Sequence, residues 1–193
     1  NFPISVGAFQ SANAGYSDAF ITKLDSSGSS ILFSTYIGGS SGEVCYSIDL
    51  DSDNNVYITG AAETGFPVTS GSFQTTCNNG DAFISKLNNT GTDLIYSTFL
   101  GGNNGGDLGR SIAVNSNGEA IITGYSSGAG FPVTPGSFQP YPNHEGTFVA
   151  KINHLGSALL FSTFLGNGES TKIVIDSVGN SIITGYTVGV GFP

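Results

Sequence analysis

A phrase that starts with Phe-Pro returns at a nearly constant interval, and this repetition is the strongest constraint on the fold. FPISVGAFQ, FPVTSGSFQ and FPVTPGSFQ begin at Phe2, Phe66 and Phe131, and a last Phe-Pro begins at Phe192. The intervals between them are 64, 65 and 61 residues. Internal repetition of this kind predicts copies of one supersecondary unit within a single architecture. We therefore divide the chain into three repeats, at about residues 2–65, 66–130 and 131–191.

Each repeat holds four short apolar runs that are bounded by turn residues. The first run is AFITKL, AFISKL or TFVAKI, and the second is ILFSTYIG, LIYSTFLG or LLFSTFLG. The third is SIDL, SIAV or KIVI, and the fourth is VYITG, AIITG or SIITG. Aromatic and β-branched runs of this length predict strands, joined in pairs as hairpins. The places in their turns where a positive φ is expected hold Gly28, Gly91 and Gly156 in one hairpin and Asn54, Gly118 and Gly179 in the other.

Four strands joined as two hairpins are the unit of a β-propeller blade. We therefore predict an all-β fold, a β-propeller built of four-stranded antiparallel blades. ILFSTYI carries apolar residues on both faces, as expected of a strand that neighbouring blades cover on both sides. An open sandwich of twelve strands is the alternative.

The phrases DAFISKL, LIYSTFLGG, SIAVNSNGEAIITGY and FPVTPGSFQ resemble the bacterial β-propeller repeat called the SBBP repeat, over essentially the whole chain. The resemblance implies a large secreted or surface-attached protein, extracellular or at the cell surface, without general catalytic residues. It also implies that the IAV-turn-IITG hairpin forms the two inner strands of a blade. The chain then holds two whole blades, at about residues 44–102 and 108–166, and two flanking half-blades at residues 18–39 and 172–186.

The predicted half-blades have unpaired strand edges, which invite pairing with another chain. Three repeats are also too few for a ring, since propellers have about four to eight blades. We therefore expect the partner to be other copies of the chain, in a ring or a filament, or the rest of a longer polypeptide. The lack of Met and the start inside a repeated phrase favour a piece of a longer chain.

Charge and hydropathy argue against two classes of partner. The net charge is −9, with five Lys and Arg residues, so nucleic acid, which requires clustered cations, is not expected. No apolar run approaches the roughly 18 residues of a membrane span, so membrane insertion is not expected either.

The sequence offers little for catalysis, and we predict that the chain is not an enzyme. His154 lies in a hairpin turn, and His144 with Glu145 supplies two metal ligands where a catalytic zinc site has three. Paired carboxylates for acid and base catalysis are not apparent. Asp18 and Asp81 recur at the start of a strand, where closing a turn explains them.

One acidic turn has the spacing of a calcium loop. Asp51, Asp53 and Asn55 alternate as at the start of an EF-hand loop, but Val56 stands where that loop requires Gly. The same turn in the other repeats lacks the pattern, so an ordinary turn is favoured. We expect no cofactor, with calcium at this turn as the alternative.

Two modifications are predicted from single residues. Cys45 and Cys77 belong to the same predicted blade, at residues 44–102, and to the same end of it, so we predict a disulfide between them, with two buried free thiols as the alternative. Asn88 starts the sequence Asn-Asn-Thr, a glycosylation sequon in a predicted turn. Together these features indicate a non-catalytic structural or adhesive module. A carbohydrate-binding propeller is the alternative, with surface glycans or proteins as partners.

Overall fold

The computed structural model describes residues 2–140 and 145–187. Two four-stranded sheets have the orders β3-β4-β5-β6 and β10-β9-β8-β7, and two further sheets have two strands each. The first large sheet contains β3 (Val44–Leu50), β4 (Val56–Ala62), β5 (Asp81–Leu87) and β6 (Leu94–Leu100). The second contains β7 (Asp107–Val114), β8 (Ala120–Ser126), β9 (Gly146–Ile152) and β10 (Leu159–Phe164). The small sheets are β1 (Ala19–Leu24) with β2 (Ile31–Ile37), and β11 (Gly168–Ile175) with β12 (Ser181–Thr187).

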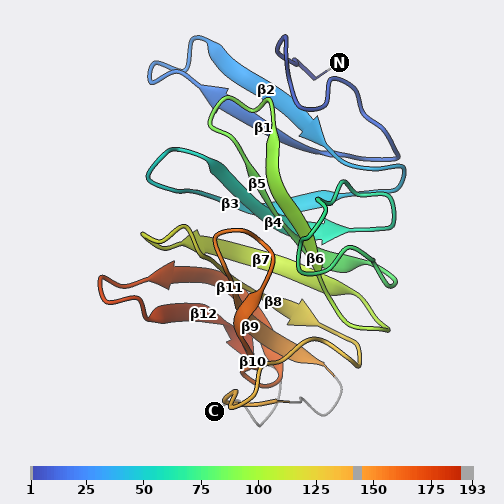
Figure 1. The fold of residues 1–193 in the computed structure, drawn as a ribbon, viewed down its shortest axis with the longest axis vertical. Coiled ribbons are helices and arrows are strands. Elements are labelled where there is room, and N and C mark those ends of the chain that lie inside the picture. Colours follow the sequence, from blue (N-terminus) through green and yellow to red (C-terminus); the bar gives the residue numbers. More distant parts are fainter. Residues whose placement is uncertain (1, 141–144, 188–193) are drawn as a thin grey trace.

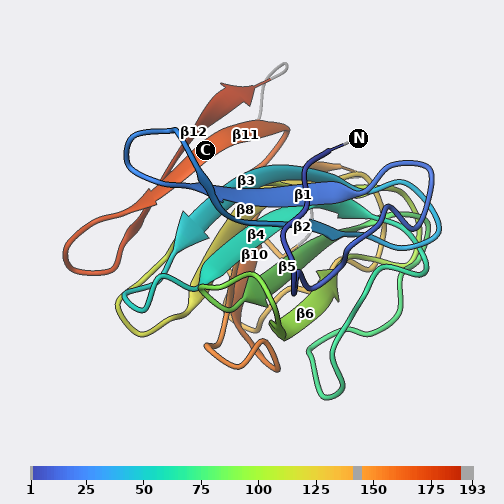
Figure 2. The same cartoon turned by 90° about the horizontal axis from the view of Figure 1, so that it is seen from above.

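All neighbouring strands within the sheets pair antiparallel, so each large sheet is one complete blade and each small sheet is half a blade. This confirms the predicted all-β fold and the predicted phase of the blades. In Figure 1 the β1–β2 half-blade lies at the top, and the β3–β6 blade separates it from the β7–β10 blade and the β11–β12 half-blade. The view from above shows these sheets lying over one another (Figure 2). The described residues thus form an open row of blades.

Hydrophobic side chains fill the spaces between successive sheets. β4 and β5 are buried at nearly every position, because each strand has a neighbouring sheet on both of its faces. One cluster joins the two complete blades and includes Tyr57, Ile84, Ile112, Ile122 and Phe148. The apolar residues on both faces of the strands are therefore explained by the stacking of blades.

The repeated Phe-Pro phrase packs the link between the inner and outer hairpins onto the blade. The ring of Phe66 lies on that of Phe83, with the centroids 4.4 Å apart, and Phe131 lies on Phe148 at the same distance. Further along the link, the Phe73 N–H donates to the Gly156 carbonyl in a turn of the next blade. The phrase therefore fixes its own blade and reaches the following one. The last Phe-Pro lies outside the described residues.

The hairpin turns follow the sequence pattern. Gly91 has a φ of 70°, and Asn54, which stands where two other repeats have Gly, has a φ of 61°. Asn is the residue other than Gly that most readily adopts this conformation. In the described part of the chain, no helix is long and apolar enough to cross a membrane.

Candidate functional site

A groove lies along the free edge of β1, between β1 and β3. It contains two pockets of about 420 and 300 Å³. Both pockets are lined by Ile21 of β1 and Ile48 of β3, and the larger one also by Phe20 and Glu43. In the complete blades, β5 and β9 pair with an inner strand, β4 or β8, at the corresponding edge.

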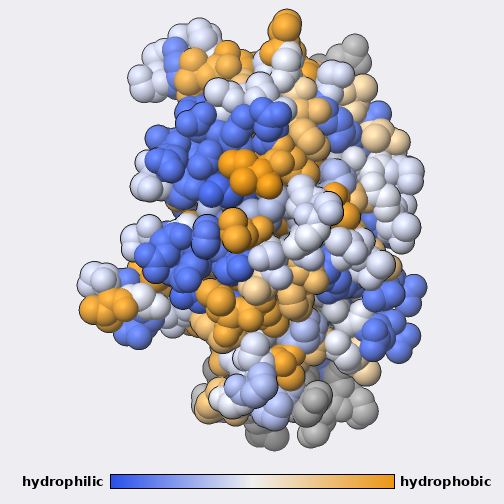
Figure 3. All heavy atoms as spheres, viewed as in Figure 1, coloured by the Kyte–Doolittle hydropathy of each residue, from blue (hydrophilic) through white to orange (hydrophobic). Residues whose placement is uncertain are grey.

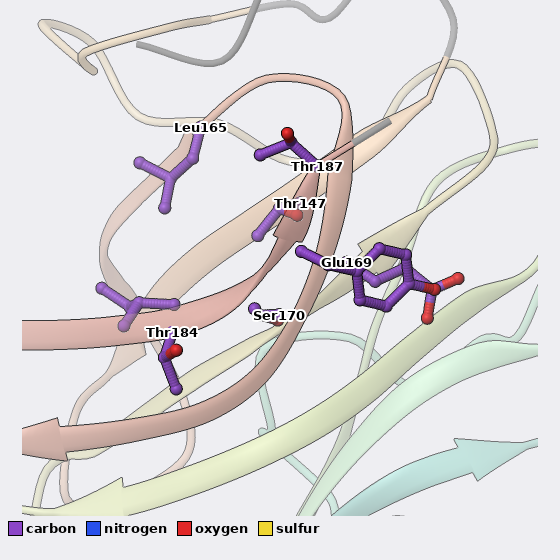
Figure 4. Close-up of a pocket in the computed structure, with 9 residues that line it drawn as sticks. Thr147, Leu165, Glu169, Ser170, Thr184 and Thr187 are labelled. Atoms are coloured by element: carbon purple, nitrogen blue, oxygen red, sulfur yellow. The ribbon is translucent and has the colours of Figure 1, made fainter. Parts of the chain in front are cut away.

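A second hollow lies at the other end of the chain, along the free edge of β12. Its volume is about 390 Å³, and Thr147, Leu165, Glu169, Ser170 and Thr184 are among the residues that line it (Figure 4). In the complete blades the outer strands β5 and β9 occupy this side of the inner hairpin. Within the described residues the two half-blades thus lack complementary parts: one has no inner strands and the other has no outer strands.

Equivalent residues show how much hydrophobic surface the missing halves leave uncovered. Ile48 of β3 is 53% exposed, whereas Ile112, at the same place in β7, is 1% exposed. Ile182 of β12 is 56% exposed, whereas Ile121, at the same place in β8, is 2% exposed. Ile48 and Ile182 are therefore exposed at positions that the fold buries wherever neighbouring strands cover them.

Half of the exposed large hydrophobic residues among those described lie on these edge elements. Those on β1 and β3 are Phe20, Leu24, Val44, Tyr46, Ile48 and Leu50, and those on β11 and β12 are Val174, Ile182 and Tyr186. The face seen in Figure 3 instead shows separate hydrophobic patches among hydrophilic residues, one of them at the tip of the β11–β12 hairpin, where Val178 is exposed. Surface of this kind along open strand edges is typical of interaction sites.

Successive inner strands are joined by one recurring hydrogen bond. The Ile112 N–H of β7 donates to Ser47 Oγ of β3 at 3.2 Å, and the Ile173 N–H of β11 donates to Ser111 Oγ of β7 at 3.2 Å. Lys172 holds the place of Ser47 and Ser111 in the third repeat. A further inner strand beside β11 would therefore meet a lysine where the internal junctions have a hydroxyl acceptor.

A lysine on the outer strand is paired with the turn of the inner hairpin in both complete blades. Lys86 Nζ lies 2.9 Å from Asp51 Oδ2, and Lys151 pairs with Glu119. Burial would raise the pKa of Asp51, but hydrogen bonds from Asn55 and Lys86 lower it to about 2. Lys23 on β1 and Asp176 in the β11–β12 turn hold the same two places at the open edges.

Carboxylates meet in pairs at two of the three junctions between sheets. Asp81, at the start of β5, faces Asp107, at the start of β7: a Cβ on Gly101 would lie 2.4 Å from Asp81 Oδ1 and 2.7 Å from Asp107 Oδ2. Asp18 and Glu43 converge on Gly38 in the same way. These pairs were not anticipated from the sequence. The predicted turn-closing role of Asp18 and Asp81 is also seen, because their Oδ2 atoms accept the N–H groups of Ala14 and Asn78.

The paired carboxylates are deeply buried. Asp81, Asp107 and Glu43 have almost no exposed surface. Burial raises the pKa of Asp81 to about 6, with a further upward contribution from Asp107, and burial also raises the pKa of Asp107 and of Glu43. One oxygen of each of the four carboxylates is buried without a hydrogen-bond partner: Asp18 Oδ1, Glu43 Oε1, Asp81 Oδ1 and Asp107 Oδ1.

The predicted disulfide is not formed, and Cys45 and Cys77 are free thiols. Both pack against the same hydrophobic cluster, as their predicted common location requires. Their sulfur atoms have different partners along the blade, since Cys45 Sγ donates to the Ser47 carbonyl and Cys77 Sγ to the Ala62 carbonyl, each at 3.5 Å. Burial raises the pKa of Cys45 to about 11 and also raises that of Cys77, so both thiols stay protonated at neutral pH.

The predicted calcium residues form a closed turn. Asp51 Oδ1 accepts the N–H groups of Asp53 and Asn55, and Asp51 Oδ2 accepts the Asn55 amide as well as the Lys86 ammonium. Among the described residues no group of three or more His, Cys, Asp and Glu side chains is placed to hold a metal ion. These contacts are those of the ordinary turn that the sequence favoured, and calcium binding at this turn stays an alternative prediction.

The remaining predicted residues lie in turns. Asn88 Nδ2 donates to Thr92 Oγ1 and to Asp93 Oδ2, both at 2.9 Å, so its glycosylation stays a prediction that requires this turn to open. His154 lies in the turn between β9 and β10, and His144 lies outside the described residues.

Four-stranded antiparallel sheets that stack face to face define a β-propeller module. Residues 32–66, which run from β2 to the second Phe-Pro, match the family model described as the beta-propeller repeat, SBBP. This part of the chain thus carries an SBBP-type repeat, as the repeated phrases indicated. No curated protein matches this chain.

Proposed function

We propose that this chain is a non-catalytic structural module that joins to further copies of the same repeat by completing half-blades. The observation that most supports this proposal is that Ile48 of β3 is half exposed, whereas Ile112, at the same place in β7, is buried. In this proposal the β11–β12 hairpin of one copy fills the groove between β1 and β3 of a second copy. The junction then has the form of the junctions inside the chain.

The internal blades define the register of this contact. Gly60 of β4 pairs with Phe83 of β5, and Gly124 of β8 pairs with Phe148 of β9. The corresponding pair between copies joins Gly185 of β12 to Phe20 of β1 on the second copy. Phe20 is more than half exposed, whereas Phe83 and Phe148 are buried, so the contact covers a side chain that the fold otherwise buries.

The same register brings opposite charges together. Lys23 of one copy takes the place of Lys86, and Asp176 of the other takes the place of Asp51. The Asp176 carboxylate is oriented as the Asp51 carboxylate is, because its Oδ2 also accepts the amide of the Asn four residues later, at 2.8 Å. The junction is therefore complementary in charge as well as in hydrophobic shape.

A charge exchange tests this proposal in solution. Lys23→Asp and Asp176→Lys each place like charges at the junction and should weaken association roughly three- to tenfold. The two changes together restore the opposite charges and should restore association. Sedimentation velocity over a range of concentrations measures the effect, with Lys151→Asp as a control that disturbs an internal pair. A stable monomer of the unchanged chain at all concentrations would refute the proposal.

The location and the adhesive role extend this proposal. An extracellular or cell-surface location rests on the resemblance to SBBP repeats, which occur in large secreted or surface-attached proteins. The loops that vary between repeats lie over a constant scaffold, which is where binding residues are commonly found. A glycan array probed with the assembled protein separates a purely structural module from an adhesive one that binds carbohydrate.

A further inference from the structure

The third junction between sheets lies between the β7–β10 blade and the β11–β12 half-blade. It has a direct hydrogen bond where the other two junctions have paired carboxylates. There, Thr147 replaces Asp81 and Gly168 replaces Asp107, and Thr147 Oγ1 donates directly to the Gly168 carbonyl at 2.7 Å. One hydrogen bond thus ties β9 of one sheet to β11 of the next. At the other two junctions the same places hold two carboxylates. When both are ionised, neither has a hydrogen to donate, so they cannot form a hydrogen bond with each other.

Both members of the pair change together within this chain. Two junctions have two acids, Asp18 with Glu43 and Asp81 with Asp107, and the third has none. Each acid is held by the same kinds of donor: a Gln side chain donates to Asp18 and Asp81, and the backbone N–H groups of Gly39 and Gly102 donate to Glu43 and Asp107 at 2.8 Å. The carboxylates are therefore oriented by neighbouring groups and are not left to solvent.

The orientation leaves one oxygen of each acid unused. Asp81 Oδ1 and Asp107 Oδ1 are buried without a hydrogen-bond partner, and Asp18 Oδ1 and Glu43 Oε1 repeat this at the first junction. The hydroxyl of Ser126, which is also buried and unpaired, lies beside Asp107. Glycines at positions 38 and 101 give the carboxylates room, because a Cβ there would collide with them. Buried unpaired oxygens that carry negative charge are costly unless a cation or a proton joins them.

We propose that the acid pairs Asp81–Asp107 and Asp18–Glu43 each bind one divalent cation of the calcium type. The side-chain groups that converge at both places are carboxylates, and hard cations prefer oxygen ligands. The cation links an outer strand of one sheet to the first inner strand of the next, which is the task of the Thr147 hydrogen bond at the third junction. The two sites are distinct from the acidic turn at Asp51.

Calorimetric titration of the metal-free protein with calcium chloride at neutral pH tests this proposal. We expect two ions per chain, and one ion after either Asp107→Asn or Glu43→Gln. Saturating calcium should raise the midpoint of thermal unfolding by about 5–10 °C for each site at a hundredfold excess over Kd. Asp53→Asn, in the turn that the sequence suggested for calcium, is the matched control and should leave the stoichiometry at two.

A second variant guards against loss of folding. Asp81→Thr combined with Asp107→Gly copies the third junction into the second, and should give a folded protein that binds one ion. The proposal is overturned if calcium neither binds nor stabilises the unchanged protein. It is equally overturned if Asp107→Asn leaves calcium binding unchanged. A calcium-free protein that is more stable to thermal unfolding at acid pH than at neutral pH would also overturn it, because a proton shared by the two acids would then hold each pair together.

Discussion

Lys86 Nζ lies 2.9 Å from the Asp51 carboxylate and 4.8 Å from the centre of the Tyr57 ring. The contact closes a blade by holding an outer strand against the turn of the inner hairpin. Because the pKa of Asp51 is lower in the folded chain, about 2, the ionised carboxylate stabilises the fold. This contribution is complete above about pH 4 and is lost as the pH falls through about 2.

Asp51→Asn should therefore lower the free energy of unfolding by about 1 kcal/mol at pH 7 and by much less near pH 2. Urea unfolding at the two pH values measures the difference. Asp53→Asn, a change of an exposed side chain in the same turn, is the control and should have little effect at either pH. An equal loss at both pH values would show that the charge of Asp51 is not responsible.

Removal of a Phe-Pro ring should destabilise the blade that it covers. Phe66 is buried against Phe83 and Phe99, so Phe66→Ala should cost about 3–5 kcal/mol. Phe138 lies in the same kind of link but is mostly exposed, and Phe138→Ala should change stability by less than about 0.5 kcal/mol. Similar losses for both variants in urea unfolding would contradict the role given to the repeated phrase.

The two thiols should react slowly in the folded protein. Burial raises the pKa of both cysteines, and the thiolate is the reactive form. Iodoacetamide at pH 8 should leave the native chain largely unmodified and add two groups after unfolding without a reductant, as intact mass will show. A mass that shows no addition to the unfolded chain would instead demonstrate a disulfide.

Lys172 should weaken the contact between copies, because it stands where Ser47 and Ser111 accept a backbone N–H. Lys172→Ser supplies the missing acceptor for the Ile48 N–H of the neighbouring copy. One hydrogen bond of about 0.5–1.5 kcal/mol corresponds to association roughly 2- to 12-fold tighter. Lys172→Ala removes the lysine without adding an acceptor, so an equal gain from both variants in sedimentation experiments would contradict this explanation.

The sequence predicted the strands, the hairpin turns and the division into blades, because these depend on local patterns that recur in every repeat. The acid pairs could not be predicted in this way. Asp18 and Asp81 recur visibly, but Glu43 and Asp107 follow connections of different length, GGSSGE and GGNNGGD. Their approach to the first acids depends on how one sheet stacks on the next.

The disulfide illustrates a different limit. The sequence placed Cys45 and Cys77 at the same end of one blade, and the structure shows both against one cluster. A disulfide also requires Cβ atoms about 3.5–4.5 Å apart with suitable directions. Strand pairing fixes Cys45 opposite Gly60, while Cys77 contacts Ala62, two residues further along β4. Sequence patterns locate residues on a strand but do not resolve this difference.

Completion of half-blades between copies is tested most directly by a cross-link across the predicted junction. In a background in which Cys45 and Cys77 are replaced by Ser, one protein carries Thr22→Cys and a second carries Ile183→Cys. These positions correspond to the internal pairs Ile58 with Ser85 and Ile122 with Ala150. Leu24→Cys, two residues from the predicted register, replaces Thr22→Cys in the control mixture.

Mass spectrometry of the oxidised mixtures, without reductant, gives the yield of the mixed dimer. The account predicts a disulfide between Cys at position 22 of one protein and Cys at position 183 of the other, with much less product in the control mixture. No mixed dimer, or equal yields in the two mixtures, would contradict the pairing of β12 with β1 of a second copy.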